Sequence, residues 1–156
     1  MIRAVRAEDR DVLAAILHGD ASFRADERAV ALELIDSALA VDPDYRVRVA
    51  LVDAQVVGYA CYGPTPMTAA SFDLYWLVVD AAHRGRGLGR GLVEHVEAEI
   101  RVGGGGNVRI ESSPAPVHAA ARALYARLGY PVAVELAGFY GADEPLLIYY
   151  KRLVAA

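Results

Sequence analysis

The segment His83-Arg84-Gly85-Arg86-Gly87-Leu88-Gly89-Arg90-Gly91 is the most informative stretch of the chain. It follows the apolar, β-branched residues 72–79 and leads into residues 88–100, whose apolar positions recur at helical spacing, so a strand, a loop and a helix are expected in succession. In such a unit the free amide groups and the positive end of the helix dipole converge where an anion can bind. Glycines let a ligand touch the backbone. The segment therefore predicts a loop that binds a phosphate-containing ligand.

Two familiar nucleotide-binding motifs do not describe this loop. A P-loop requires G-x-x-x-x-G-K-[ST] and a dinucleotide-binding loop requires G-x-G-x-x-G, and counting from any of its first three glycines gives neither. A glycine-rich turn that only allows close packing of strand and helix is the alternative interpretation. Arg84, Arg86 and Arg90 surround the glycines, and this basic stretch suits a compact phosphate ligand better than a nucleic-acid duplex.

Composition and charge limit the classes of function. The 156 residues fit one domain spanning 1–156, and no apolar run approaches the roughly 20 residues of a membrane span. The N-terminal residues lack an apolar signal core, so a cytoplasmic location without membrane attachment is expected. A net charge of -4 without a large Lys/Arg cluster argues against nucleic-acid partners. The single cysteine, Cys61, lies in an apolar segment and is expected in the core, and the four scattered histidines predict no metal site.

Hydrophobic periodicity predicts an alternation of strands and helices. Helices are expected from residue 7, over 26–40, after the glycine loop to about 100 and over 116–128, and strands near 2–6, 46–52, 56–62, 72–79, 108–112, 132–136 and 146–151. The order β-α-α-β-β-β-α-β-α-β-β predicts an α/β fold with a mixed sheet covered by helices.

Two segments resemble the signature of the GNAT superfamily of N-acetyltransferases. Arg84-Gly85-Arg86-Gly87-Leu88-Gly89 is similar to the family's pyrophosphate loop, R/Q-x-x-G-x-G/A. The segment from His118 to Tyr130 is similar to the family's N-x-x-A-x-x-L-Y-x-x-x-G-F/Y, with His118 where asparagine is frequent. The resemblance implies a GNAT-like acyl-CoA N-acyltransferase fold, with acetyl-CoA as the cosubstrate.

The resemblance also implies how acetyl-CoA is bound. The backbone of the strand before the loop would pair with the pantetheine arm as an added strand, and the loop amides would hold the pyrophosphate. His118 would add one polar contact, although the departure from asparagine leaves that contact open. The cofactor-binding residues expected on this basis are Leu77, Val78, Val79, Arg84, Gly85, Arg86, Gly87, Leu88, Gly89, Arg90 and His118.

Acetyl transfer from a thioester to an amine needs a neutral amine and a proton for the departing thiolate. Tyr125 stands where the family usually keeps its general acid, and a packing tyrosine is the alternative. Asp73 is the first candidate for the base, because related enzymes place a glutamate on the corresponding strand; Glu111 and a water relay are the alternatives. Strand alternation predicts that Asp73, Tyr75 and Leu77 share one face.

The resemblance leaves the amine acceptor unidentified. The segment 139–144, expected to join the last two strands, would border the acceptor, so Phe139, Tyr140 and Glu111 are candidate substrate-binding residues. The leading hypothesis is an enzyme that acetylates a primary amine of a small molecule or a protein. A non-catalytic acyl-CoA sensor and a toxin that acetylates aminoacyl-tRNA are the alternatives, and the absence of a basic face argues against the toxin. Homodimers are common in the family, but no segment specifies an interface.

Overall fold

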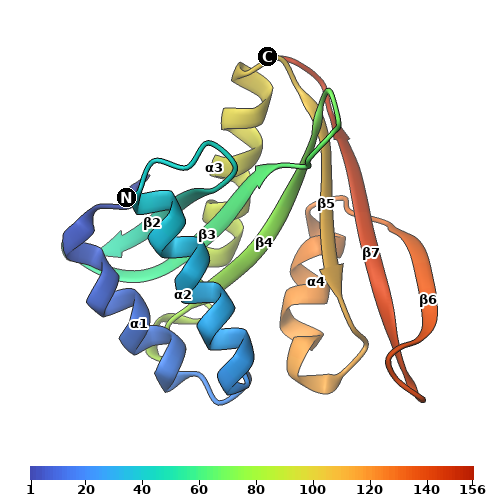
Figure 1. Cartoon of the computed structure of the whole chain (residues 1–156), viewed down its shortest axis with the longest axis horizontal. Helices are drawn as coiled ribbons and strands as arrows, with labels where there is room; N and C mark the ends of the chain where they lie inside the picture. Colours follow the sequence, from blue (N-terminus) through green and yellow to red (C-terminus); the bar gives the residue numbers. More distant parts are fainter.

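The computed structural model describes all 156 residues and contains one seven-stranded sheet. Its strand order is β1-β2-β3-β4-β5-β7-β6, and all neighbours are antiparallel except β4 and β5. The strands are β1 (Ile2–Ala4), β2 (Arg46–Val52), β3 (Gln55–Pro64), β4 (Ser71–Val79), β5 (Gly106–Ser112), β6 (Val132–Gly141) and β7 (Glu144–Leu153). The predicted element order and the mixed α/β fold are confirmed (Figure 1).

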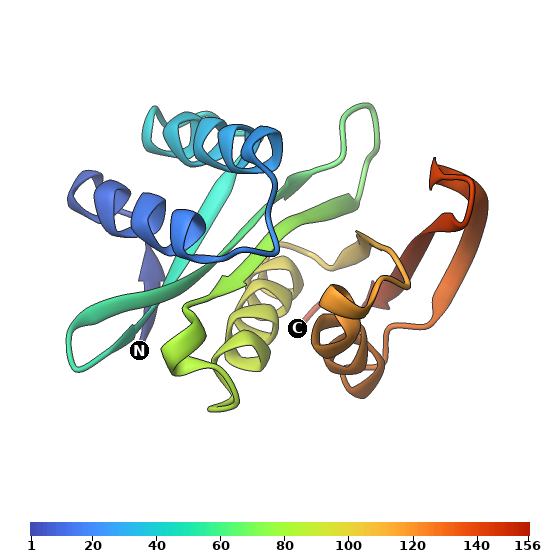
Figure 2. The same cartoon turned by 90° about the horizontal axis from the view of Figure 1, so that it is seen from below.

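Four α-helices cover the two faces of the sheet. The helices are α1 (Arg10–Gly19), α2 (Ala25–Leu39), α3 (Leu88–Val102) and α4 (Ala119–Arg127), with short 3-10 turns at Ala7–Asp9, Ala81–His83 and Pro116–His118. Figure 2 shows α1 and α2 on one face and α3 and α4 on the other. No helix is both long enough and apolar enough to cross a membrane.

Each face of the sheet has its own hydrophobic core. Under α1 and α2, fully buried side chains such as Leu13, Leu17 and Ile35 pack on β2 and β3, together with the predicted core cysteine Cys61. On the other face, a larger cluster runs from β2 to β7 beneath α3 and α4 and includes Tyr125. Burial of this apolar surface provides the main stabilisation of the fold.

The last two strands are longer than the sequence pattern indicates. β6 runs to Gly141, so Phe139 and Tyr140 lie in this strand. Its antiparallel pairing with β7 is interrupted after Leu136 and resumes at Gly141↔Glu144. The expected loop over 139–144 is therefore wrong, and residues 142–143 alone make the turn. Residues 137–140 have no partner in β7, and Gly138 lies among them at φ +67°, so this part of β6 is an irregular extension that strand periodicity does not predict.

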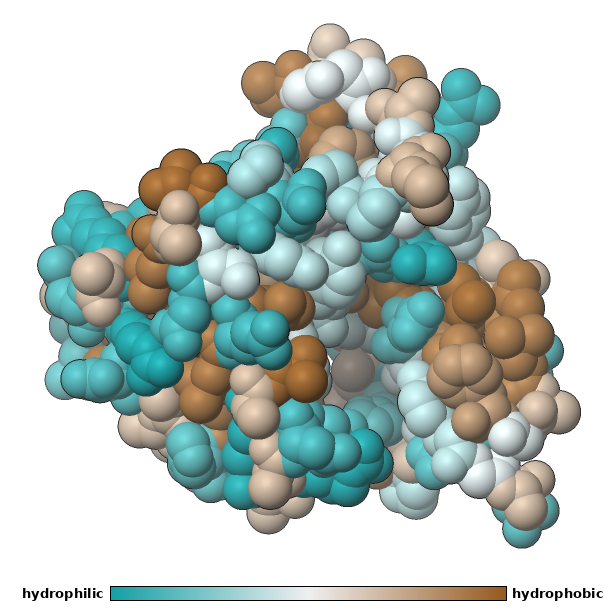
Figure 3. Space-filling model, in the orientation of Figure 1, coloured by the Kyte–Doolittle hydropathy of each residue, from teal (hydrophilic) through white to brown (hydrophobic).

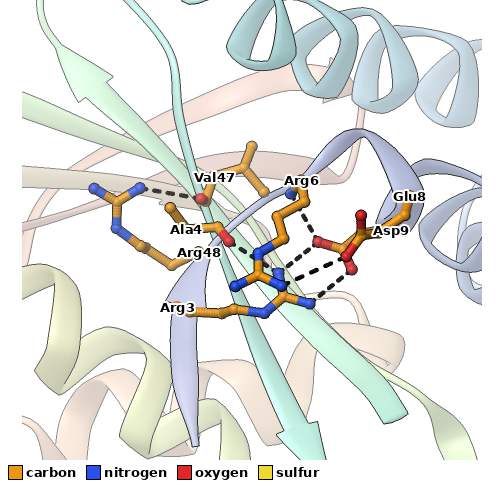
Figure 4. Close-up of polar contacts among 7 residues, drawn as sticks. All are labelled: Arg3, Ala4, Arg6, Glu8, Asp9, Val47 and Arg48. Carbon is orange, nitrogen blue, oxygen red and sulfur yellow. Dashed lines mark hydrogen bonds and ion pairs between the residues drawn. The ribbon is translucent and has the colours of Figure 1, made fainter. Parts of the chain in front are cut away.

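A partly buried ion pair fixes the N-terminal strand to the first helical turn. Arg3 donates two hydrogen bonds to the Asp9 carboxylate, at 2.6 and 2.9 Å, and the Arg6 amide donates a third at 2.7 Å (Figure 4). The Arg3 hydrogen bond, followed by the Arg6 amide and the nearby charges, lowers the pKa of Asp9 despite its burial. The carboxylate is therefore ionised at neutral pH and holds β1 against the start of α1.

Candidate active site

The two parallel strands β4 and β5 separate part-way along their length. They pair only over residues 71–74 of β4 and 107–110 of β5. Beyond that point β5 pairs with β7 alone and β4 pairs with β3 alone, so one edge of β4 faces no strand over residues 75–79. Figure 1 shows the strands diverging here, and Figure 3 shows a hollow in the surface at the corresponding place. We call the space between residues 75–79 of β4 and the end of β5 the wedge. Every second residue of the open edge directs its amide and carbonyl groups into the wedge.

A β-bulge at Tyr75 explains where the strands separate. In the pairing with β3, Cys61 lies opposite Trp76 and Tyr62 opposite Leu74, which leaves Tyr75 as an extra residue. A bulge bends its strand and increases the local twist. It also interrupts the alternation of side chains.

The bulge makes the expected grouping of Asp73, Tyr75 and Leu77 on one face wrong. Leu77 packs with the core beneath α3 and α4, whereas Tyr75 packs with the core of the opposite face. Tyr75 and Asp73 therefore lie on the face covered by α1 and α2, and Leu77 lies on the face covered by α3 and α4. Alternation fails here because the extra residue shifts every later side chain of the strand to the opposite face.

The glycine loop begins directly beside the open edge of β4. Gly85 and Gly87 have φ values of +76° and +78°, which L residues rarely adopt, and a Cβ on either would contact nothing within 4 Å. The first main-chain hydrogen bond into α3 runs from the Gly91 amide to the Gly87 carbonyl at 2.9 Å. The amides of residues 88–90 have no partner within the chain and lie at the positive end of the α3 dipole. This arrangement fits a phosphate ligand.

Gly89 connects the loop to the apolar side of the wedge. A Cβ at Gly89 would lie 3.4 Å from a methyl group of Leu124 in α4 and 3.9 Å from methyl groups of Leu77 and Val79 in β4. The start of α3, the middle of α4 and the open part of β4 therefore meet at one apolar point. Tyr125 follows Leu124 directly in α4.

The three arginines of the loop have different surroundings. The Arg84 guanidinium donates to the Val79 carbonyl at 3.0 Å and to the Asp20 carboxylate in the turn between α1 and α2. Arg90 pairs with Glu94 one helical turn later, at 2.8 Å. Arg86 is exposed and makes no ion pair within the chain. Arg86 is therefore the arginine whose charge is not already shared with a carboxylate.

Tyr125 is buried in a cluster of aromatic rings. Its ring centroid lies 5.5 Å from that of Tyr149 in β7 and 6.3 Å from that of Tyr130, and 6% of the residue is exposed. Burial, with a smaller contribution from Tyr149, raises the pKa of Tyr125 to about 12. The phenol therefore keeps its proton at neutral pH.

Asp73 lies on β4 just before the bulge and is buried with two partners. Arg109, its neighbour in register on β5, donates to one carboxylate oxygen at 2.6 Å, and Thr65 donates to the other at 2.8 Å. An ionised carboxylate has about four acceptor positions, so two remain. Tyr75, two residues further along β4, has its pKa raised to about 12 by burial and by the Asp73 charge.

The other substrate-binding candidates lie at the outer edge of the same face. Glu111 is exposed on β5, one residue beyond the last pair with β4. Phe139 and Tyr140 are half exposed on β6, with their rings edge to face at 5.0 Å. Burial raises the pKa of Tyr140, and the neighbouring carboxylates Glu111, Glu144 and Glu27 raise it further. Carboxylates from α2, β5 and β7 thus act on one phenol.

Two features of this region escaped sequence reasoning. Ser113 is buried, and its hydroxyl donates to Glu144 at 2.8 Å. Arg122 of α4 donates to the carbonyls of Ser113 and Ala115, both at 2.8 Å, and so fixes the loop between β5 and α4. His118 ends that loop immediately before α4 and is half-buried. A Ser-Ser-Pro-Ala-Pro segment marks a rigid turn, but nothing local identifies its distant partners.

Comparison with known proteins places this geometry in a family. A family model described as an acetyltransferase (GNAT) domain matches residues 46–132. The chain belongs to the GNAT family. The matched residues contain β2 to α4 and thus the wedge, the glycine loop and Tyr125. The predicted resemblance is confirmed.

Solved GNAT structures share the whole fold. A protein from Desulfovibrio desulfuricans assigned to the GNAT acetyltransferase family is 32% identical, with a TM-score of 0.93 and 99% of both chains covered. The ribosomal-protein-S18-alanine N-acetyltransferase of Escherichia coli is 21% identical, with a TM-score of 0.79 over 100% of this chain and 95% of that one. No curated protein sequence matches the chain.

A third relative bears on the cosubstrate. A Salmonella typhimurium structure described as an acetyltransferase with its cofactor acetyl-CoA is 22% identical, with a TM-score of 0.75 over 98% of this chain and 93% of that one. Family membership identifies the chain as an acetyltransferase of the GNAT type, and the expectation of acetyl-CoA as the cosubstrate agrees with it.

Proposed function

We propose that this chain is an N-acetyltransferase that transfers the acetyl group of acetyl-CoA to a primary amine of a small molecule or a protein, by direct attack of the amine on the thioester. The observation that carries the proposal is the wedge between β4 and β5, with its open strand edge beside the uncapped start of α3. An extended amide-containing arm adds to such an edge as a strand would. A pyrophosphate suits the adjacent glycine loop.

The binding roles follow from this placement. The backbone of Leu77, Val78 and Val79 would pair with the pantetheine arm, and the free amides of residues 88–90 would hold the pyrophosphate. Arg86, which has no carboxylate partner, would add charge at the phosphates. His118, at the start of α4, remains a candidate for one further contact.

Acetyl-CoA supplies an activated acetyl thioester, and the chain supplies proton control around it. Tyr125 is proposed as the general acid for the departing thiolate. Its neighbour Leu124 reaches the apolar point where α3, α4 and β4 meet, which supports a position of the tyrosine next to the wedge. A phenol kept neutral by burial is suited to donate a proton at neutral pH.

The opposite face of the wedge is proposed as the acceptor side. An amine arrives mostly as its ammonium form, which the carboxylates around Tyr140 would attract. Asp73 and Glu111 both remain candidates for removal of the amine proton, directly or through water. Asp73 is buried in contact with Arg109, whereas Glu111 is exposed, so Glu111 is the more accessible of the two.

Calorimetry with CoA and a screen of amines and peptides for CoA release test the proposal. Binding of CoA together with amine-dependent release of CoA is the expected result. Binding without release by any amine would favour the sensor hypothesis, and absence of binding would contradict the assignment. Asp73→Asn and Glu111→Gln, compared on an accepted amine, distinguish the two candidates, because the variant that lacks the base should lose the larger part of kcat.

A further inference from the structure

The side chain of Arg84 connects the glycine loop to the turn between α1 and α2. Its guanidinium donates to the Val79 carbonyl at the end of β4 and to the Asp20 carboxylate immediately after α1. The Asp20 contact is the only side-chain hydrogen bond between residues 10–39 and residues 80–91. The link joins the proposed cofactor side of the site to a segment that covers the acceptor face.

Asp20 is fixed by hydrogen bonds within the α1–α2 turn and from α2. The amide and hydroxyl of Ser22 donate to its carboxylate at 2.9 and 2.6 Å, and Arg28 of α2 donates to its carbonyl at 3.1 Å. The Asp20 side chain is 10% exposed, against 52% for Arg84. Burial alone would raise the pKa of Asp20, but the Ser22 hydrogen bonds and the Arg84 charge lower it, so the carboxylate is ionised. Asp20 is therefore a fixed anchor for a more exposed partner.

The loop needs such an anchor because its own backbone is permissive. Between Arg84 and the first residue of α3 lie Gly85 and Gly87, both at positive φ. α3 fixes the loop at its far end, and the turn Ala81–His83 holds the chain just before the loop. Arg84 follows that turn directly, and its side chain is the one that joins this end of the loop to the α1–α2 turn. A loop with fewer such contacts must be ordered to a greater extent when the ligand binds, and that ordering lowers affinity.

We propose that Asp20 is a positioning residue, which acts through Arg84 to hold the glycine loop in its pyrophosphate-binding conformation and to couple that loop to the α1–α2 turn. The inference rests on the proposed function. Asp20 itself need not touch the cosubstrate. Because coupling between two sites is reciprocal, acetyl-CoA bound at the loop also stabilises the turn on the acceptor side.

Asp20→Asn in the full chain tests this role, with Asp26→Asn as the matched control. Asp26 lies in the same part of the chain but is exposed and pairs with Arg24, without contact to the glycine loop. By calorimetry, CoA affinity is expected to fall about five- to twentyfold in Asp20→Asn and less than about twofold in Asp26→Asn. The first value corresponds to the loss of one charged hydrogen bond, reduced because the Arg84 side of that bond is exposed to solvent. The KM for acetyl-CoA should rise similarly while kcat stays close to wild type.

A double-mutant cycle with Arg84→Gln separates this role from a general loss of structure. Asp20→Asn should weaken CoA binding in the wild-type background and have little further effect in the Arg84→Gln background. Arg84 is half exposed, so Arg84→Gln also tests the contact if Asp20→Asn does not fold. Additive effects, or unchanged affinity in either folded single variant, would overturn the role of Asp20. A wild-type chain that binds no CoA would instead overturn the proposed function, and the inference with it.

Discussion

Tyr125 and Asp73 are both almost fully buried, yet their surroundings differ. Aromatic rings surround Tyr125, and burial raises its pKa to about 12. Asp73 instead accepts hydrogen bonds from Arg109 and Thr65. An apolar aromatic setting for one group and a polar, hydrogen-bonded setting for the other suit them to different roles in proton transfer.

Tyr125→Phe tests the proposed acid, because it keeps the ring and removes only the proton. We expect kcat to fall about a hundred- to ten-thousand-fold, with the KM for acetyl-CoA and the melting temperature little changed. Tyr130→Phe is the matched control, since Tyr130 is also a buried phenol of this aromatic cluster. Wild-type kcat in Tyr125→Phe, under conditions where chemistry limits the rate, would show that Tyr125 only packs.

The pH dependence of the rate follows from the same burial. A raised pKa means that the phenol remains protonated, and so able to donate, up to about pH 12. The amine must lose its proton, so the rate should rise with pH towards the ordinary amine value of about 10. Steady-state rates between pH 6 and 10.5, with circular dichroism to verify folding, should therefore rise to a plateau. A decrease between pH 8 and 10 in folded protein would contradict a donor role for Tyr125.

The free amides at the start of α3 lead to a prediction at the scale of a single element. Gly87→Ala places a methyl group in the open space before α3, where the phosphate would bind, and costs about 1 kcal/mol of backbone strain, because Gly87 is at φ +78°. Gly129→Ala is a matched control, with φ +79°, equally open space and a position after α4. Both variants should lose similar stability in urea unfolding, and only Gly87→Ala should also lose CoA affinity. Equal CoA affinity in the two variants would argue against phosphate binding at this helix end.

The attachment of β1 to the first helical turn gives a second element-scale prediction. The pKa of Asp9 is lowered in the folded chain, so its contribution to stability is present above the ordinary pKa of about 4 and is lost as pH falls through the lower folded value. Asp9→Asn should cost roughly 2–4 kcal/mol of unfolding free energy at pH 7, and the difference from wild type should shrink below about pH 4. Glu8→Gln, at an exposed pair, should change stability little at either pH. A pH-independent deficit in Asp9→Asn would contradict the ionic origin.

The sequence predicted the elements better than the contacts between them. Glycine and proline breakers, together with helical and strand periodicity, were sufficient for the order of strands and helices. The bulge at Tyr75 was not predictable, because it is defined by the pairing of β4 with β3 and not by any local residue preference. The contact of Arg84 with Asp20 joins residues 64 positions apart, and only the folded chain brings them together.

At the scale of the whole molecule, the sheet is continuous at one end and divided at the other. β1 to β4 form one part and β5 to β7 the other, and between them the strands pair over only four residues of each. The core beneath α3 and α4 spans both parts, so the fold does not depend on this pairing alone. A ligand seated in the wedge would contact β4 and α3 on one side and α4 on the other. Binding should therefore stabilise the two parts together.

Ligand-dependent stability is the test at this scale. A ligand that binds only the folded state at a hundred times its Kd adds about 2.7 kcal/mol, which is about 5–10 °C of melting temperature for a chain of this size. We expect this shift with CoA, together with slower hydrogen exchange in residues 84–90 and in α4, because the ligand bridges the open end of the sheet. Gly87→Ala should show a smaller shift at the same CoA concentration. If saturating CoA slowed exchange around the glycine loop but left α4 unchanged, the ligand would occupy the loop without filling the wedge, and Tyr125 could not serve as its acid.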